Sequence, residues 1–295
     1  MPRLMCATDL LPKSEAALDR AGMLAQQLQA PLSLLHVVVP TISELNLEQS
    51  LQQAIAGLNS RVRAPAWRFG PPPEIAVRTG SPSRLILDSI DKHRVDLLVV
   101  GPHRKRGLRD VLEGTIAEKV LNTRQCPLLL VQRPAEAEYR QVLLALDVAE
   151  ESGAAVRAAE SLVLNARAQA MVMHVVEPPY QGMMRSAGVG TEEVISYVNH
   201  SRREAAAEIR DLLRRTSADH TRYGVVIGDS HPARAIRRAV EMYQPDLLVM
   251  GTSSGRVRRA LIGSIASQVM DAAGCDVLVV PRGAVPARSR ASSLH

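Results

Sequence analysis

A stretch reading Asp96-Leu97-Leu98-Val99-Val100-Gly101 recurs in the chain as Asp246-Leu247-Leu248-Val249-Met250-Gly251. In each copy an acidic residue precedes a run of apolar residues, and a glycine follows the run. A short continuous apolar run is typical of a strand that is buried on both faces. Such strands occur in parallel sheets covered by helices on both sides, so this stretch predicts an α/β fold.

Other segments recur in the same order, which indicates a tandem duplication. Leu34-Leu35-His36-Val37-Val38 corresponds to Val172-Met173-His174-Val175-Val176, which lies 138 positions later. Leu4–Asp9 corresponds to Val142–Asp147 at the same offset. We therefore predict two copies of one domain, here called the first and the second repeat.

The boundary between the repeats lies near residues 132–138, where proline and alternating charges interrupt the apolar pattern. We predict the first repeat over residues 1–134, the second over 138–282, and a disordered tail over 283–295. Within each repeat, short apolar runs alternate with longer helical patterns. This alternation predicts two tandem, doubly wound, open parallel sheets with helices on both faces.

The strand candidates of the first repeat are its short runs rich in leucine and valine. They cover residues 4–8, 32–39, 74–78, 95–100 and 127–131. The second repeat has a longer gap, with 54 positions from His174 to Gly228 against 44 from His36 to Gly80. We interpret the extra residues as an extended loop that precedes a helix starting near Thr191.

The chain of 295 residues has 36 basic and 30 acidic residues, a formal net charge of +6. Almost all of the basic residues are arginine, and alanine is also enriched, a combination that we attribute to coding bias. Arginine pairs such as Arg202-Arg203 and Arg237-Arg238 lack the interleaved aromatic residues of a single-strand-binding platform. The prediction is therefore a solvated basic surface and no nucleic-acid partner.

The three cysteines, Cys6, Cys126 and Cys275, form no CxxC motif and no zinc-binding set. Widely spaced cysteines with apolar neighbours favour a reduced interior. No apolar run approaches the roughly 20 residues of a membrane-spanning helix, and the first residues resemble no signal peptide. We expect a cytoplasmic protein without a metal centre or a membrane partner.

Two features come together at the carboxyl ends of the predicted strands in each repeat. An aspartate, Asp9 or Asp147, ends the first strand, and a glycine, Gly101 or Gly251, follows the fourth. Ligands of open α/β sheets bind at this edge, where the strand order reverses. A glycine lets the backbone approach an anion, and the helix that follows, opening at Gly114-Thr115 in the first repeat, offers free N–H groups.

The strand-1 aspartate, the Leu-His-Val of strand 2 and the loop spacing Gly-x2-Gly-x9-Gly-(Ser/Thr) resemble the universal stress protein family, and the whole chain resembles its tandem members. The resemblance implies a strand order of 3-2-1-4-5 in each repeat. It also implies ATP or another adenine nucleotide, possibly with Mg²⁺, held by the loop and the fourth helix with its adenosine end near strands 1 and 2.

The resemblance further implies how the parts assemble. The last strands of the two repeats, Leu128–Val131 and Val277–Val280, are expected to meet across the domain interface, so that the repeats pair within one chain. Pairing of this kind covers an exposed sheet edge. Two chains are then expected to associate as a homodimer.

Matching the family's nucleotide site position by position gives one set of residues in each repeat. The first set is Asp9, Val37, Gly101, Gly114 and Thr115, and the second is Asp147, Val175, Gly251, Gly263 and Ser264. Arg104 and Ser254 stand where the family has its second glycine. The Arg104 side chain could fill the phosphate cradle, or its guanidinium could bind phosphate. The second loop is one residue shorter, which slightly favours the first repeat.

The function expected from this resemblance is that of a cytosolic stress-response protein with ATP as a regulatory ligand in at least one repeat. The chain has no Walker A sequence and no evident general base beside the loop, so we expect no robust catalysis and only slow, incidental hydrolysis.

Two alternatives remain open. The first is an interaction module whose clefts are degenerate and empty and which contacts unidentified protein clients. The second is a hydrolase, because Gly251-Thr252-Ser253-Ser254-Gly255 matches the GxSxG motif directly after a strand. A hydrolase would need an acid and a histidine downstream of Ser253, and only Asp271, Asp276 and His295 follow it.

Overall fold

The computed structural model describes residues 1–40, 44–63, 67–102, 116–123, 126–147, 153–164, 166–176, 178, 180–217, 219, 222–228, 231–252 and 274–281. The strands of the first repeat are β1 (Leu4–Thr8), β2 (Leu32–Val38), β3 (Glu74–Thr79), β4 (Leu97–Val100) and β5 (Leu128–Leu130). Its helices are α1 (Glu15–Leu28), α2 (Glu44–Val62), α3 (Pro82–His93) and α5 (Ile116–Thr123), with a 3-10 turn, η1 (Pro12–Ser14), before α1.

The second repeat follows the same plan. Its strands are β6 (Gln141–Ala145), β7 (Gln169–Val175), β8 (Tyr223–Gly228), β9 (Leu247–Gly251) and β10 (Asp276–Val280). Its helices are α6 (Gly153–Leu162), α7 (Gln181–Ser186), α8 (Thr191–Thr216) and α9 (Pro232–Tyr243). Among the helices of the described ranges, none combines the length and the apolar character needed to cross a bilayer.

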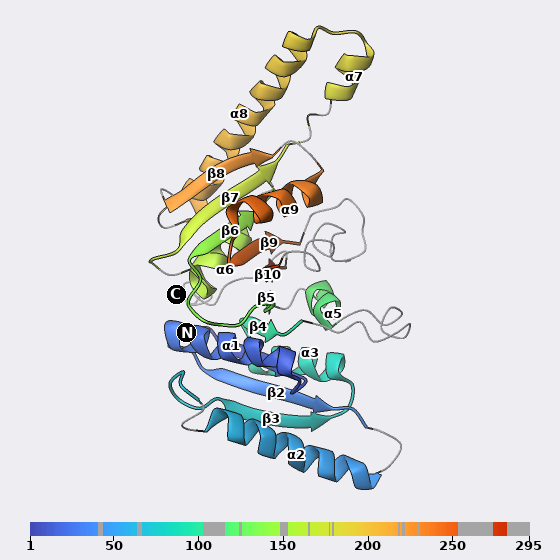
Figure 1. The fold of residues 1–295 in the computed structure, drawn as a ribbon, viewed down its shortest axis with the longest axis vertical. Helices are drawn as coiled ribbons and strands as arrows, with labels where there is room; N and C mark the ends of the chain where they lie inside the picture. The colour runs from blue at the N-terminus through green and yellow to red at the C-terminus, as the bar shows by residue number, and fades with distance from the viewer. Residues whose placement is uncertain are drawn as a thin grey trace, which may run out of the picture.

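The ten strands form one continuous sheet in the order β3-β2-β1-β4-β5-β10-β9-β6-β7-β8. Each half therefore has the order 3-2-1-4-5, which confirms the prediction. Strands within each half run parallel, whereas β5 and β10 are antiparallel, with Leu129 opposite Leu278. The last strands of the two repeats thus meet as expected, and the sheet continues from one repeat into the other (Figure 1).

Helices cover both faces of the sheet, as the apolar runs predicted. On one face the core contains α1, α2, α6 and α8, with buried residues such as Leu24 and Leu162 at equivalent positions of α1 and α6. On the other face it contains α3, α5 and α9, with Ile90 of α3 among its buried residues. The central strand β4 contributes Leu97 and Val99 to the first core and Leu98 to the second, so both of its faces are buried.

The insertion of the second repeat differs from its predicted form. Helix α8 begins at Thr191 as expected, but the residues before it include the short helix α7 instead of only an extended loop. Tyr180, just before α7, lies with its ring 6.5 Å from that of Tyr197 in α8. Val194 of α8 is buried. Helix α7 packs on α8, a tertiary contact that the local pattern does not encode, and both extend beyond the sheet (Figure 1).

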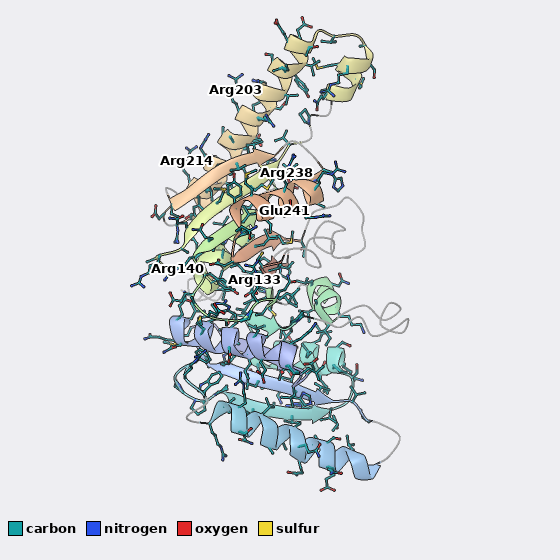
Figure 2. All side chains as sticks on the ribbon, viewed as in Figure 1. Arg133, Arg140, Arg203, Arg214, Arg238 and Glu241 are labelled. Carbon is teal, nitrogen blue, oxygen red and sulfur yellow. The ribbon has the colours of Figure 1, made fainter. Side chains whose placement is uncertain are left out.

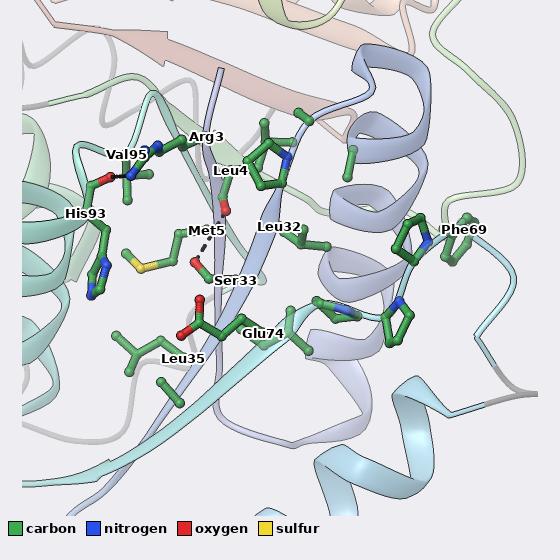
Figure 3. A pocket seen from close by; sticks show the side chains of 18 of the residues that line it. Arg3, Leu4, Met5, Leu32, Ser33, Leu35, Phe69, Glu74, His93 and Val95 are labelled. Atoms are coloured by element: carbon green, nitrogen blue, oxygen red, sulfur yellow. Dashed lines mark hydrogen bonds between the residues drawn. The ribbon is translucent and has the colours of Figure 1, made fainter. Parts of the chain in front are cut away.

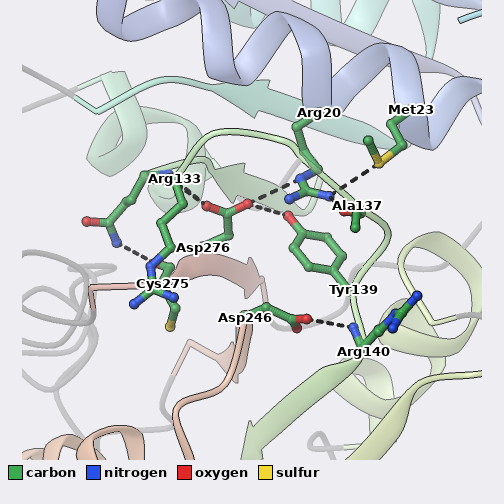
Figure 4. Close-up of polar contacts among 10 residues, drawn as sticks. Arg20, Met23, Arg133, Ala137, Tyr139, Arg140, Asp246, Cys275 and Asp276 are labelled. Carbon is green, nitrogen blue, oxygen red and sulfur yellow. Dashed lines mark hydrogen bonds and ion pairs between the residues drawn. The ribbon is translucent and has the colours of Figure 1, made fainter.

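A buried polar network lies where the linker crosses the junction between β5 and β10. Asp276, at the start of β10, accepts hydrogen bonds from the backbone N–H groups of Gln132 (2.8 Å) and Arg133 (3.2 Å) and from the Tyr139 hydroxyl (2.7 Å). Burial, together with the Asp276 carboxylate, raises the pKa of Tyr139 well above its ordinary value, so the phenol remains a donor. Figure 4 shows these contacts joining the linker to the second repeat.

Candidate functional site

The carboxyl ends of β1 and β4 lie next to each other, because the two strands pair directly, with Ala7 opposite Val100. Asp9 follows β1 and Gly101 follows β4. From β1 the chain proceeds outward through β2 to β3, and it then returns to β4 on the other side of β1. Asp9 and Gly101 therefore flank the point where the strand order reverses, which is the position that the sequence predicted for a ligand site.

The Asp9 carboxylate organises the turn that follows β1. Its Oδ1 accepts hydrogen bonds from the backbone N–H of Leu11 (3.0 Å) and from the Ser14 hydroxyl (2.5 Å). Leu10 adopts a left-handed conformation, with φ of 61°, and its N–H donates to the Thr8 hydroxyl. Asp9 is exposed, and its second carboxylate oxygen has no partner among the described residues.

Ser14 is a neighbour of this site that the sequence reasoning did not identify. A Cβ added to Gly101 would lie 3.1 Å from both the Oγ and the Cα of Ser14. The glycine is therefore needed for the close approach of η1 to the end of β4, a reason additional to the predicted approach of an anion. The spacing of five residues between Asp9 and a serine at the helix start is the signal that could have revealed this contact.

The second repeat places its residues in the same way. Asp147 is exposed and follows β6, Gly251 ends β9, and β6 pairs with β9 as β1 pairs with β4. Around a Cβ built on Gly251, no heavy atom of the described residues lies within 4 Å. The counterparts of Lys13 and Ser14 are residues 151 and 152, which lie outside the described residues.

Two histidines at equivalent positions hold these strand ends in place. The Nδ1 of His36 lies 2.8 Å from the carbonyl oxygen of Thr8, and that of His174 lies 2.9 Å from the carbonyl oxygen of Leu146. A carbonyl oxygen can only accept, so Nδ1 carries the proton in both rings. Each histidine thus fixes the residue before the site aspartate, which is a structural role.

Val37 and Val175 follow these histidines in β2 and β7. Both valines are half-buried and pack against the core on the α3 and α9 face. Each therefore presents an apolar side chain near the carboxyl end of the strand next to the one that carries the site aspartate.

Helix N-termini gather at the same edge, because each helix that follows a parallel strand starts where that strand ends. Helices α1, α3 and α5 begin there in the first repeat, and α6 and α9 in the second. The N-terminus of a helix carries a partial positive charge and unpaired N–H groups. The backbone carbonyl of Lys13 lies beside Gly101, and the Lys13 residue is exposed. The edge therefore favours an anionic group.

Half of the predicted site residues belong, in each repeat, to the loop after the fourth strand and to the start of the helix that follows this loop. Arg104, Gly114, Thr115, Ser254, Gly263 and Ser264 lie outside the described residues, as do Ser253, Asp271 and His295 of the hydrolase alternative. The remaining predicted site residues are Asp9, Val37, Gly101, Asp147, Val175 and Gly251. In each repeat they are brought to the carboxyl ends of adjacent strands.

Asp276 cannot serve as the acid of a hydrolase built on Ser253. It lies opposite Leu247 at the amino end of β10, whereas Gly251, which leads to Ser253, lies opposite Val280 at the other end. Its side chain is 1% exposed and accepts three hydrogen bonds within the domain junction. The carboxylate is thus at the wrong edge of the sheet and already satisfied.

Arg203 and Arg214 lie on α8 and Arg238 lies on α9, and all three are exposed (Figure 2). Arg214 and Arg215 both pair with Asp211 on the same helix, at 3.1 Å and 3.0 Å, and Arg238 is exposed. These are solvated helix surfaces of the kind the sequence predicted. Within the described ranges, no group of three or more His, Cys, Asp or Glu side chains is placed to hold a metal ion.

Comparison with known proteins identifies what this arrangement is similar to. The model of the Universal stress protein family matches residues 1–132 and again residues 138–281. Universal stress protein A homolog 1 of Coxiella burnetii is 28% identical over 144 residues, which is 43% of this chain and 94% of the relative. Universal stress protein YxiE of Bacillus subtilis is 29% identical over 145 residues, 44% of this chain and 98% of the relative. Each relative thus corresponds to a single repeat.

Among solved structures, the fold resembles the crystal structure of a universal stress protein from Archaeoglobus fulgidus, with a TM-score of 0.69. The match covers 95% of this chain and 96% of that one at 18% sequence identity. The similarity therefore extends over both repeats and shows a shared fold.

Proposed function

The chain belongs to the universal stress protein family as a tandem member, and we propose that it is a cytosolic stress-response protein that binds ATP or another adenine nucleotide in at least one repeat. The nucleotide acts as a regulatory ligand and not as the substrate of a robust reaction. The observation that carries the proposal is an aspartate with an unpartnered carboxylate oxygen beside a glycine at the point of strand-order reversal.

The chemistry of the edge suits both ends of such a ligand. Adenosine carries N–H and O–H donors, and the exposed oxygen of Asp9 is an acceptor placed beside β2, with the half-buried Val37 as an apolar neighbour. Phosphates are anions, and the helix N-termini at the same edge carry a partial positive charge. The edge thus offers an acceptor for the adenosine and a partial positive charge for the phosphates of an adenine nucleotide. Any Mg²⁺ would bind together with the phosphates.

The proposed ligand residues are those of the family's pattern. In the first repeat they are Asp9, Val37, Gly101, Arg104, Gly114 and Thr115, and in the second Asp147, Val175, Gly251, Ser254, Gly263 and Ser264. Asp9 is held by Ser14 and the Leu11 N–H, so it acts as a fixed acceptor and not as a general base. This arrangement supports binding without efficient hydrolysis.

Thermal unfolding of the full chain with ATP, ADP and AMP tests the proposal. A ligand at 100 times its dissociation constant stabilises its protein by about 2.7 kcal/mol, so a rise in Tm of several degrees is expected. Absence of a shift with all three nucleotides would overturn the proposal.

Matched substitutions assign the repeat that binds. Asp9→Asn keeps the oxygen that accepts from Leu11 and Ser14 but puts an NH2 donor in place of the free carboxylate oxygen. Asp147→Asn is the equivalent change in the second repeat, and at least one of the two should abolish the shift. Asp88→Asn, at an exposed position of α3 whose ion pair with Arg84 spans 3.9 Å, is the control and should keep it. A shift that survives the double variant Asp9→Asn with Asp147→Asn contradicts the proposed site.

The packing of Ser14 against Gly101 favours a second candidate function, because it explains the glycine without a ligand. In this case the chain is an interaction module that contacts client proteins through degenerate, empty clefts. Nucleotide released on denaturing the freshly purified protein would rule out this candidate, and its absence together with the lack of a thermal shift would support it.

The proposed assembly follows from the open edges of the sheet. We propose folding units over residues 1–134 and 138–282, a disordered tail over 283–295, and a homodimer of the paired chain. Size-exclusion chromatography with light scattering measures the mass of the full chain in solution. A mass of 32.0 kDa, that of a single chain, would contradict the homodimer.

A further inference from the structure

A pocket of about 790 Å³ opens at the amino ends of β1, β2 and β3, at the edge opposite to the candidate nucleotide site. The last turn of α3 forms one wall, and the loop 67–73 closes the other end. Pockets of about 300–1,000 Å³ are typical of small-molecule sites. Figure 3 shows Glu74 extending into this space near Ser33 and Leu35, with His93 facing them from α3.

The second repeat has less space at the same place, where Met171 replaces Ser33 and Tyr243 replaces His93. Its equivalent pocket measures about 290 Å³. There, the Met171 side chain packs over Gly224, with Cε 3.8 Å from where a Cβ would lie. At four positions around this pocket, the polar residue of the first repeat is replaced in the second repeat by a residue that is less polar or larger. The pairs are Ser33 and Met171, Glu74 and Gly224, Ser89 and Ala239, and His93 and Tyr243.

Two of these polar groups lack partners. Ser89 is 7% exposed and lines the pocket, yet its hydroxyl has no hydrogen-bond partner among the described residues. This hydroxyl is therefore available to donate to or accept from a ligand in the pocket. Glu74 also has no ion pair within the described part of the chain. The pocket thus contains a hydroxyl and a carboxylate that can bind a ligand, whereas the second repeat has Ala239 and Gly224 at these positions.

The floor of the pocket is apolar and its charges are of both signs. Met5 and Leu35 are 2% and 3% exposed and line it from β1 and β2. Glu74 and Arg78 stand on the same face of β3, four residues and therefore about 13 Å apart along the strand. Both residues are exposed, and the Glu74 side chain extends into the pocket (Figure 3). The acidic Glu74 and the basic Arg78 therefore suit a small ligand that carries opposite charges at its two ends.

We propose that this pocket binds a zwitterionic amino compound with an apolar body, of the size of a dipeptide. Its ammonium group pairs with Glu74, its carboxylate with Arg78, and its apolar side chains rest on Met5 and Leu35. Ser89 supplies a hydroxyl to a polar atom of the ligand backbone. The site uses neither Asp9 nor Gly101. Glu74 lies at the opposite end of the strands from them, whereas Arg78 pairs in register with Val37.

Titration calorimetry of the full chain with the dipeptide Leu-Leu at millimolar concentration tests the proposal. Binding is expected, and both N-acetyl-Leu-Leu, which lacks the ammonium group, and Leu-Leu amide, which lacks the carboxylate, should bind at least about tenfold more weakly. No binding of Leu-Leu, or equal binding of the three compounds, would overturn the proposal.

Three variants locate the binding. Ser33→Met introduces the residue of the second repeat and should abolish binding by filling the pocket. Glu74→Gln, at an exposed position that tolerates the change, should weaken Leu-Leu at least about tenfold. Glu241→Gln, on the exposed face of α9, is the matched control and should leave binding unchanged.

Unchanged binding in Ser33→Met and Glu74→Gln would contradict this site. The nucleotide-induced thermal shift measured on the same variants separates the two proposals. It should persist in both, since neither residue is near Asp9, and its absence from the wild type would not affect the dipeptide result.

Discussion

Arg20 of α1 and Asp276 of β10 form a buried ion pair across the junction of the two repeats, with Nε 3.3 Å from Oδ2 and side chains 6% and 1% exposed. The Arg20 guanidinium also lies 4.1 Å from the centroid of the Tyr139 ring and donates to the carbonyl oxygen of Ala137. The two repeats and the linker are thus joined by one polar cluster (Figure 4). The repeat equivalents of Arg20 and Asp276 are Ala158 and Pro127, so the ion pair has no counterpart across the pseudo-twofold axis.

Asp276→Ala is expected to destabilise the chain strongly. The substitution leaves a buried Arg20 without its counter-charge, and breaking a buried pair in this way costs about 3–5 kcal/mol. Urea unfolding followed by circular dichroism measures the loss. Asp211→Ala removes the two exposed ion pairs with Arg214 and Arg215 on α8 and should change stability by less than about 1 kcal/mol. Equal effects of the two substitutions would contradict a stabilising role for the junction pair.

Tyr139→Phe keeps the ring under Arg20 but removes the hydroxyl that donates to Asp276 at 2.7 Å. One acceptor of a buried carboxylate is then left without its donor, which costs about 1–3 kcal/mol. The midpoint of urea unfolding reports the change. Tyr180→Phe, at a position 59% exposed, is the matched control, and a comparable loss there would refute the assignment.

Gly101→Ala should destabilise the first repeat through the contact with Ser14. The added Cβ meets a backbone atom at 3.1 Å, which a side-chain rotation cannot relieve, and overpacking of this kind costs about 1–3 kcal/mol. Gly57→Ala, in α2 with nothing within 4 Å of the new Cβ, should instead stabilise by roughly 0.5–1 kcal/mol. Thermal unfolding of both variants makes the comparison, and a neutral Gly101→Ala would contradict the packing described here.

The three cysteine thiols should make stability decline in alkaline solution. Burial raises the pKa of Cys6 and of Cys126 to about 12 and that of Cys275 to about 11. In the unfolded chain these thiols lose their protons near pH 9, so the folded state binds more protons above that pH and its stability falls as pH rises toward about 11–12.

Denaturant unfolding at pH 8 and at pH values above 9 measures this decline, and Cys275→Ala should reduce its slope. The same burial predicts slow reaction of all three thiols with a disulfide reagent in the native protein and fast reaction after unfolding. Rapid labelling of the native chain would contradict buried, protonated thiols.

The sequence predicted the fold and the general position of the site because both depend on patterns repeated along the chain. Apolar runs such as Leu97–Val100 indicate strands buried on two sides. Because parallel strands end at the same edge of a sheet, Asp9 and Gly101, which each follow a strand, lie at one edge. The contact of Ser14 with Gly101 could not be predicted in this way, because it depends on how η1 settles against β4.

The pocket at the amino edge illustrates the same limit. Ser33, Glu74 and His93 belong to separate elements, and none forms a motif with its sequence neighbours. Only the pairing of β2 with β3 and the packing of α3 bring them to one space.

The sequence by itself therefore determined the duplication, the alternation of strands and helices and the chemical types available at each strand end, since periodic burial is written in local residue order. The strand order followed from the resemblance to the family. Tertiary structure alone decided that Arg20 meets Asp276, that Ser14 occupies the space beside Gly101, and that the amino edge of the first repeat remains open. These contacts join residues far apart in the chain, and their energies depend on distances and burial that arise only when the helices and the sheet have packed.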